Sequence, residues 1–230
     1  MFDEIVQDYN RLEPPGTDAW NPLTNEWELW NRVRLFIELR RALRLLPIPI
    51  EKVRVLDVGC GTGRSSLALI FFGVKPENIL GIDLRPSAVA YAKSLNPAIN
   101  FQVVKSFKDW PPVGSFDLCM QCVAFSSIHR MEERKTLAEQ MERTVGDNGY
   151  IFWWDRKFAN PWAGGDALKP KMLFKERVVI MYRLVPLCPT AQESMRPLCG
   201  LRRIFAPVVG ILGYFSKHVA ALFGPKFKVH

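Results

Sequence analysis

The sequence predicts an α/β fold, a doubly wound sheet of mostly parallel strands with helices on both faces. Apolar runs of strand length alternate with segments of helix length from position 52 onward. Five such runs lie between positions 53 and 154, too close together for any connection other than single helices or short loops. Right-handed crossovers between parallel strands then give the doubly wound order.

Each predicted element has a local signal. Gly73 stops the first helix of the sheet region, Pro86 opens the second, and the turn Asp147 to Gly149 leads into the fifth strand. The predicted strands are 53–58, 78–83, 101–104, 116–121 and 150–154, and the helices between them are 64–72, 87–94 and 131–145. A helix at 26–46 precedes this region. A strand at 177–184, a helical stretch near 198–216 and a strand at 218–223 follow it.

Composition places the chain among folded proteins. Of its 230 residues, 48% are hydrophobic and 23% are charged, which excludes a disordered, collagen-like or coiled-coil chain. The longest uncharged apolar run, Ile204 to Phe215, has twelve residues and contains Pro207, so it is too short to span a bilayer. The first residues lack the basic and apolar regions of a secretory signal, so we expect a cytoplasmic protein.

The net charge of +8 is concentrated in the last third of the chain. Residues 1–155 carry 18 Lys and Arg against 20 Asp and Glu, whereas residues 156–230 carry 13 against 3. Such a basic region suits a phosphate-bearing small substrate, an anionic membrane surface or nucleic acid. The apolar stretch 198–215, with Arg202 and Arg203 near its start, fits either peripheral contact with lipid headgroups or packing on the core.

The cysteines favour neither a disulfide framework nor a metal site. Their number, five, is odd, and their spacing is irregular. Cys119 and Cys122 form a C-x-x-C, but residues three apart in a strand point to opposite faces. No metal is therefore expected.

The most specific motif is the glycine-rich turn after the first predicted strand, V-L-D-V-G-C-G-T-G from Val55 to Gly63. Glycines at this edge let the backbone approach a ligand closely. Position 64 is Arg64, where a dinucleotide-binding motif would have its third glycine, and no G-K-[ST] follows, so a nucleoside without a pyrophosphate fits best. Asp83 ends the second strand, where a carboxylate accepts hydrogen bonds from a ribose diol.

These segments, together with G-I-D, F-D-L and G-Y-I-F further along, resemble the motif series of class I S-adenosylmethionine-dependent methyltransferases over residues 52–155. The resemblance implies a Rossmann-like, seven-stranded sheet whose last strand is antiparallel, with strands six and seven at 177–184 and 218–223. It also implies S-adenosyl-L-methionine as the cofactor. A weaker resemblance, in the segments after residue 153, is to methyltransferases of bacterial glycan and secondary-metabolite pathways.

The resemblance also assigns cofactor-binding residues. Asp57, Gly59, Cys60 and Gly61 would line the methionine portion, Asp83 would hold the ribose hydroxyls, and Leu84 would pack on the adenine. Ser106 and Phe107 stand where the family often has an acidic residue followed by a small one, so the usual acid is missing at the adenine end. Gln121 falls where the methionine moiety and the acceptor meet, and Tyr9 and Trp20 belong to a segment that would close on the cofactor.

For a hydroxyl acceptor, the candidate general base is His129, in the loop after the fourth strand. A surface histidine opening the next helix is an equal alternative. Gln121 to Ala124 lacks the D/N-P-P-Y/F motif of enzymes acting on planar nitrogens, and the residues after Asp155 are basic, which argues against a catechol-type metal site.

Three regions and three functions are therefore predicted. Residues 1–50 would form a helical lid, 51–155 the cofactor-binding core, and 156–230 a basic region that completes the sheet and adds acceptor-side helices. The leading hypothesis is methyl transfer to a small molecule or glycan, at oxygen. The alternatives are an RNA or protein methyltransferase, and a non-catalytic module that binds nucleic acid or a membrane.

Overall fold

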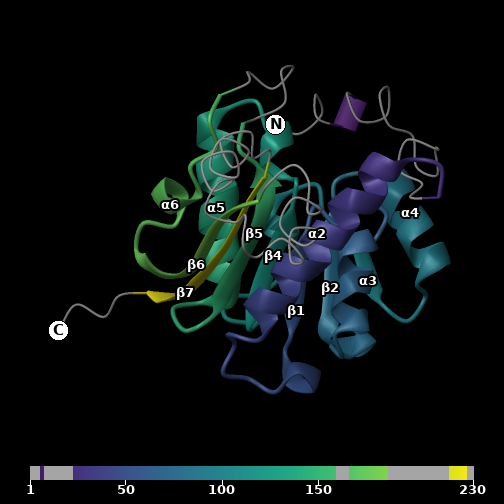
Figure 1. The fold of residues 1–230 in the computed structure, drawn as a ribbon, viewed down its shortest axis with the longest axis horizontal. Helices are drawn as coiled ribbons and strands as arrows, with labels where there is room; N and C mark the ends of the chain where they lie inside the picture. The colour runs from purple at the N-terminus through teal and green to yellow at the C-terminus, as the bar shows by residue number, and fades with distance from the viewer. Residues whose placement is uncertain (1–5, 8–22, 159–165, 186–217, 227–230) are drawn as a thin grey trace, which may run out of the picture.

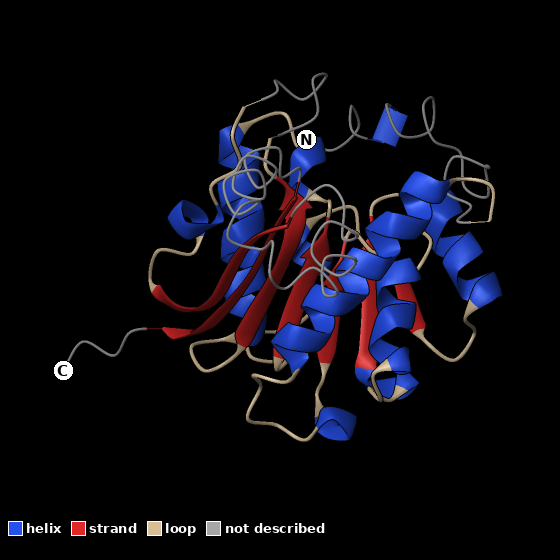
Figure 2. Ribbon diagram, in the orientation of Figure 1, coloured by secondary structure: helices blue, strands red, loops and turns tan. Residues whose placement is uncertain are grey.

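The computed structural model describes residues 6–7, 23–158, 166–185 and 218–226, and in this part of the chain the fold is a single seven-stranded sheet between two layers of helices (Figures 1 and 2). The strand order is β3-β2-β1-β4-β5-β7-β6. Strands β1 to β5 pair in parallel, and β7 is antiparallel to both β5 and β6. This is the Rossmann-like sheet with a reversed last strand that the sequence predicts.

The strands lie close to their predicted positions. They are β1 (Val55–Val58), β2 (Ile79–Asp83), β3 (Asn100–Val103), β4 (Leu118–Cys122), β5 (Tyr150–Arg156), β6 (Arg177–Val185) and β7 (His218–Lys226). The first strand begins two residues later than predicted. The amide of Val53 bonds back to Ile50 in the short 3-10 turn η2 (Ile50–Lys52), and the amide of Arg54 donates to the Asp117 carboxylate.

The helices cover the sheet on both faces. They are α2 (Glu26–Leu43), α3 (Arg64–Phe71), α4 (Pro86–Leu95), α5 (Met131–Val145) and the short α6 (Pro170–Leu173). The side chain of Asn25 caps α2 by accepting a hydrogen bond from the backbone of Glu28. Helix α2 ends three residues earlier than predicted, because the amides of Leu45 and Leu46 bond three residues back and tighten the chain into a turn.

Two apolar cores result, one on each face of the sheet. Residues of α2, α3 and α4 pack with Val55, Phe152 and other strand residues in one core. Helix α5 and Phe174 pack with Leu56, Trp153 and neighbours in the other. Cys119 lies in the second core and Cys122 against the first, as strand alternation predicts.

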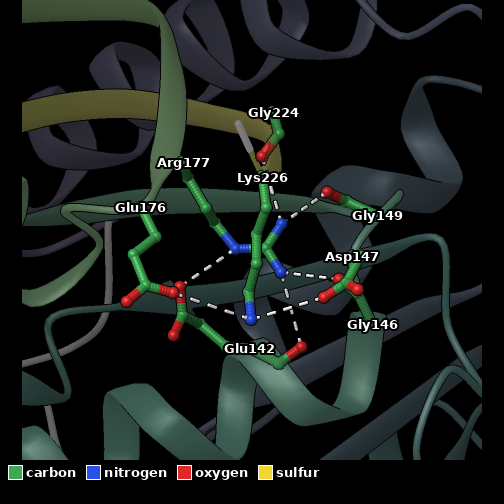
Figure 3. A network of polar contacts seen from close by, with 8 residues as sticks. All are labelled: Glu142, Gly146, Asp147, Gly149, Glu176, Arg177, Gly224 and Lys226. Carbon is green, nitrogen blue, oxygen red and sulfur yellow. Dashed lines mark hydrogen bonds and ion pairs between the residues drawn. The ribbon is translucent and has the colours of Figure 1, made fainter. Parts of the chain in front are cut away.

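At the amino edge of the parallel strands, a buried guanidinium ties three segments together (Figure 3). Arg177 donates to the carbonyl oxygens of Gly146 at 2.6 Å, Gly149 at 2.8 Å and Gly224 at 3.1 Å, and to the Glu142 carboxylate at 3.2 Å. Its side chain is fully buried. The arginine thus satisfies carbonyl groups after α5, before β5 and within β7.

Several predictions fall outside the described residues. Tyr9, Trp20, the stretch 198–216 and five of the 13 basic residues after position 155 are among them. The lid and the regional boundaries at 50 and 155 therefore stay predictions. None of the helices within the described ranges is both long enough and apolar enough to cross a membrane.

Candidate cofactor site

The glycine turn leaves the carboxyl end of β1 with three residues in the left-handed region. Gly59, Gly61 and Gly63 have φ of +67°, +55° and +79°, which an L side chain adopts only with strain. A Cβ at Gly63 would lie 2.8 Å from Cζ of Phe101, so this glycine also allows the turn to pack on the core. At Gly61 the nearest atom would be Nη2 of Arg85 at 3.6 Å, so the turn is accessible on this side.

Strand β2 holds the turn in place. The carbonyl oxygen of Ile82 accepts hydrogen bonds from the amides of Gly59 and Cys60, at 2.9 and 3.0 Å. The amide of Gly61 donates to Oδ2 of Asp83 at 2.9 Å. The Cys60 thiol packs in the core, and burial raises its pKa well above the usual range. Cys60 can therefore face a ligand only through its backbone.

Asp83 and Leu84 stand at the end of β2, beside this turn. The second carboxylate oxygen of Asp83, Oδ1, accepts from the amide of Arg85 at 2.9 Å and faces its Nε at 3.4 Å. Leu84, next in the chain, is partly buried. The structure thus brings the predicted ribose-binding carboxylate to the glycine turn, and adds an arginine contact that the sequence did not indicate.

Asp57 is fully buried under the N-terminal turn of α3. Its Oδ2 accepts hydrogen bonds from the hydroxyls of Ser65 and Ser66, both at 2.6 Å. Burial raises the pKa of Asp57 to about 6, against the lowering effect of the two hydroxyls. Its Oδ1 has no hydrogen-bond partner among the described residues.

Gln121 is equally buried, one strand away in β4. Its Oε1 accepts from the amide of Ala124 at 3.0 Å, and its Nε2 has no partner within the described part of the chain. Strand alternation places Asp57 on the α3 face and Gln121 on the other. Each leaves one polar atom unsatisfied close to the carboxyl edge.

The segment between β4 and α5 carries the candidate base. It includes the short 3-10 turn η5 (Phe125–Ser127), and His129 follows it, partly buried, at the carboxyl edge of the sheet. Val123 has φ of +65°, a strained conformation for a β-branched residue. The sequence gives no sign of this strain.

Ser106 and Phe107 flank the start of another 3-10 turn, η4 (Phe107–Asp109). Ser106 caps it by accepting from the amide of Lys108 at 3.2 Å, and the rings of Phe107 and Trp110 lie 5.7 Å apart. Local packing thus accounts for these contacts, and adenine binding by the pair stays a prediction.

Sequence reasoning missed the roles of two buried charges near His129. Asp155, at the end of β5, accepts hydrogen bonds from the amides of Phe125 and Ser126, and burial raises its pKa to about 6. Arg134 in α5 donates to the carbonyl oxygen of Ile128. Asp155 lies about thirty residues from its partners, so no local pattern could reveal the contact. Among the described residues, no group of His, Cys, Asp and Glu could hold a metal ion.

The geometry defines a class of protein: a doubly wound nucleoside-binding domain with a glycine turn after β1 and a carboxylate after β2. Comparison with known proteins makes this more specific, since residues 55–149 match a family described as "Methyltransferase domain". The match, the fold and the relatives below support the predicted class I S-adenosylmethionine-dependent methyltransferase domain, with S-adenosylmethionine as the methyl donor.

The chain is similar to proteins of differing acceptor. It is 27% identical over 157 residues to magnesium-protoporphyrin O-methyltransferase of Rhodobacter capsulatus, covering 63% of this chain and 69% of that one. The fold is similar to that of the N-methyltransferase NodS of Bradyrhizobium japonicum in complex with S-adenosyl-L-homocysteine. There the TM-score is 0.67 with 16% identity, over 97% of this chain and 99% of that one. The fold is also similar to that of a TehB-like methyltransferase from Corynebacterium glutamicum. The TM-score is 0.56 with 17% sequence identity, over 97% of each chain.

The residues present fit an adenosyl sulfonium ligand. A cation or ammonium group suits the buried oxygen left open on Asp57, and a nucleoside can approach the turn at Gly61, where only the end of the Arg85 side chain stands nearby. When bound, this group supplies a methyl on positively charged sulfur that needs no further activation. The protein's own task is then to place an acceptor.

Proposed function

We propose that the chain methylates an oxygen atom of a small-molecule acceptor, with His129 as the general base. The observation that carries the proposal is the position of His129 at the carboxyl edge, on the segment that follows β4. A histidine is suited to take a hydroxyl or carboxyl proton near neutral pH. The similarity to an O-methyltransferase acting on a magnesium porphyrin supports an oxygen acceptor and makes that compound the first to test.

The cofactor would lie along the glycine turn, between the ends of β1 and β2. Gly59, Gly61 and the backbone of Cys60 form the floor beneath the methionine portion, where the free oxygen of Asp57 accepts a donor. Asp83 takes the ribose hydroxyls, exchanging its contact with Nε of Arg85, and Leu84 covers the adenine. As the sequence predicts, the cofactor would also contact Ser106, Phe107, Gln121, Tyr9 and Trp20.

Because the methyl donor is already activated, methyl transfer depends mainly on how the acceptor oxygen is positioned. In-line displacement at a methyl needs the acceptor oxygen within about 3.5 Å of the carbon and on the side opposite the sulfur. The imidazole of His129 takes the acceptor's proton as the new bond forms.

Calorimetric titration with S-adenosyl-L-homocysteine tests the cofactor site. Asp83→Ala should abolish binding, because it removes the ribose acceptor and the anchor of the Gly61 amide. Asp117→Ala is the matched control. Asp117 lies directly before β4, at the opposite edge of the sheet, and its carboxylate pairs with Arg54. Binding of S-adenosyl-L-homocysteine should therefore be unchanged in this variant.

Transfer of labelled methyl tests the acceptor. The enzyme is incubated with labelled cofactor and, separately, magnesium protoporphyrin, a fractionated small-molecule extract, RNA and protein. An oxygen acceptor is identified in either of two cases. Alkaline hydrolysis releases the label from a methyl ester, or the labelled product is shown to be a methyl ether. His129→Gln should reduce transfer about 100-fold or more without weakening cofactor binding. Label found only in RNA or protein would refute the proposal.

A further inference from the structure

The segment that carries His129 is held from two sides by buried side chains of opposite charge. On the β5 side, Oδ2 of Asp155 accepts hydrogen bonds from the amides of Phe125 at 2.9 Å and Ser126 at 3.2 Å. The other oxygen of this carboxylate accepts from the amide of Arg156 at 2.7 Å, and the residue is fully buried. Asp155 therefore fixes the start of η5 to the end of β5.

On the α5 side, Arg134 holds the residue directly before His129. Its Nε and Nη2 both donate to the carbonyl oxygen of Ile128, at 3.0 and 2.7 Å, and Nη1 bonds to Asp166 at 2.5 Å. The Arg134 side chain is only 1% exposed. The guanidinium is thus immobilised on one backbone oxygen, with Asp166 as its counter-charge.

The beginning of the segment is strained and also tied down. Val123 has φ of +65°, and its amide donates to the carbonyl oxygen of Trp154 at 2.8 Å. Such a conformation persists only where surrounding contacts enforce it. The path from β4 to His129 is therefore fixed at Val123, at Phe125 and Ser126, and at Ile128.

We propose that Asp155 and Arg134 are positioning residues that hold the backbone of residues 123–128 so that His129 meets the acceptor. The inference rests on the proposed function of His129. Burying a charge is costly unless it is well paired. Here Asp155 and Arg134 each form two hydrogen bonds with the backbone of this one segment. A shift of about 1 Å in a catalytic group can lower turnover about 100-fold, so such fixation has a direct catalytic consequence.

Asp155→Asn and Arg134→Lys are the test variants, because each keeps the size of the side chain and part of its hydrogen bonding. Arg177→Met is the matched control: it removes another buried arginine that bonds to backbone carbonyls, but at the opposite edge of the sheet (Figure 3). All are measured well below their unfolding temperatures, so that loss of stability is not read as loss of function.

Two readouts are expected to move together. Relative to the amides in the rest of the sheet, hydrogen exchange in 123–130 should become at least 10-fold faster in both test variants, and this local increase should be absent in the control. Turnover of the small-molecule fraction that accepts label should fall 10- to 100-fold, while its KM and the Kd for S-adenosyl-L-homocysteine stay within about threefold.

The inference is overturned if exchange in 123–130 is unchanged in either test variant, or if turnover falls no more than in the control. Arg134→Met removes both bonds to Ile128, so it should be more severe than Arg134→Lys; equal loss would also count against a positioning role. If the wild-type protein transfers no label to any small molecule, the proposed function fails, whereas the exchange experiment still tests the contacts independently.

Discussion

Alanine at Gly63 and at Gly61 should destabilise the protein by different amounts, although both glycines have positive φ. The left-handed conformation costs an alanine about 1–2 kcal/mol at either site. At Gly63 the added Cβ would also lie 2.8 Å from Cζ of Phe101 and 3.2 Å from Cβ of Ala92, both fully buried. Overpacking of this kind costs a further ~1–3 kcal/mol.

We therefore expect about 2–5 kcal/mol of lost stability for Gly63→Ala and about 1–2 kcal/mol for Gly61→Ala. The reduced entropy of the unfolded chain offsets up to about 1 kcal/mol of each loss. Urea unfolding followed by circular dichroism gives both values, with an unchanged slope showing that the unfolded states are comparable.

A double-mutant cycle identifies the source of the difference. Phe101→Leu removes the ring atom that the new methyl would meet, so it should cost less in the Gly63→Ala background than in the wild type, by about 0.5–3 kcal/mol of coupling. Equal losses for the two alanine variants, or no coupling with Phe101→Leu, would refute the account of a turn limited by core packing.

Three further results are expected. Arg177→Met should lose about 3–5 kcal/mol of stability in urea unfolding, because it leaves buried carbonyl groups without their donor and removes the ion pair with Glu142. A variant as stable as the wild type would contradict this role of Arg177. The pKa of Asp57 is raised from 3.8 to about 6 in the folded state, so the native protein binds the extra proton between these values. Its contribution to stability therefore falls as pH rises from about 4 to 6, by about 3 kcal/mol, and Asp57→Asn should flatten the pH profile of the unfolding midpoint in that range. Burial raises the pKa of Cys60, Cys119 and Cys122, so alkylation mapped by mass spectrometry should leave all three unmodified at pH 8 until the chain unfolds.

Much of the fold could be predicted from sequence because its signals are local. Apolar runs mark the strands, and Gly73 and Pro86 mark helix ends. The predicted and observed bounds of α5, 131–145, coincide, since its apolar residues recur at helical spacing and a Gly-rich turn follows. The glycine turn and Asp83 are also adjacent by topology alone, because parallel strands end at one edge.

The acceptor side could not be predicted in the same way. Its decisive contacts join Asp155 to Phe125 and Arg134 to Ile128, pairs set by the packing of β5 and α5 rather than by spacing. From the sequence, Asp155 could be placed only directly after a strand, beside basic residues that argue against a metal site. The positive φ of Val123 has no sequence signal, since valine disfavours this conformation more than most residues.

The strained backbone at Val123 links the acceptor side to the formation of the sheet. A residue held in this region costs about 1–3 kcal/mol, which surrounding contacts must offset. Two contacts with the end of β5 can offset this cost. The amide of Val123 donates to the carbonyl oxygen of Trp154, and the amide of Phe125 donates to the Asp155 carboxylate. The segment before His129 therefore depends on β5 being in register with β4, so the geometry of the candidate base is completed only when the sheet itself has formed.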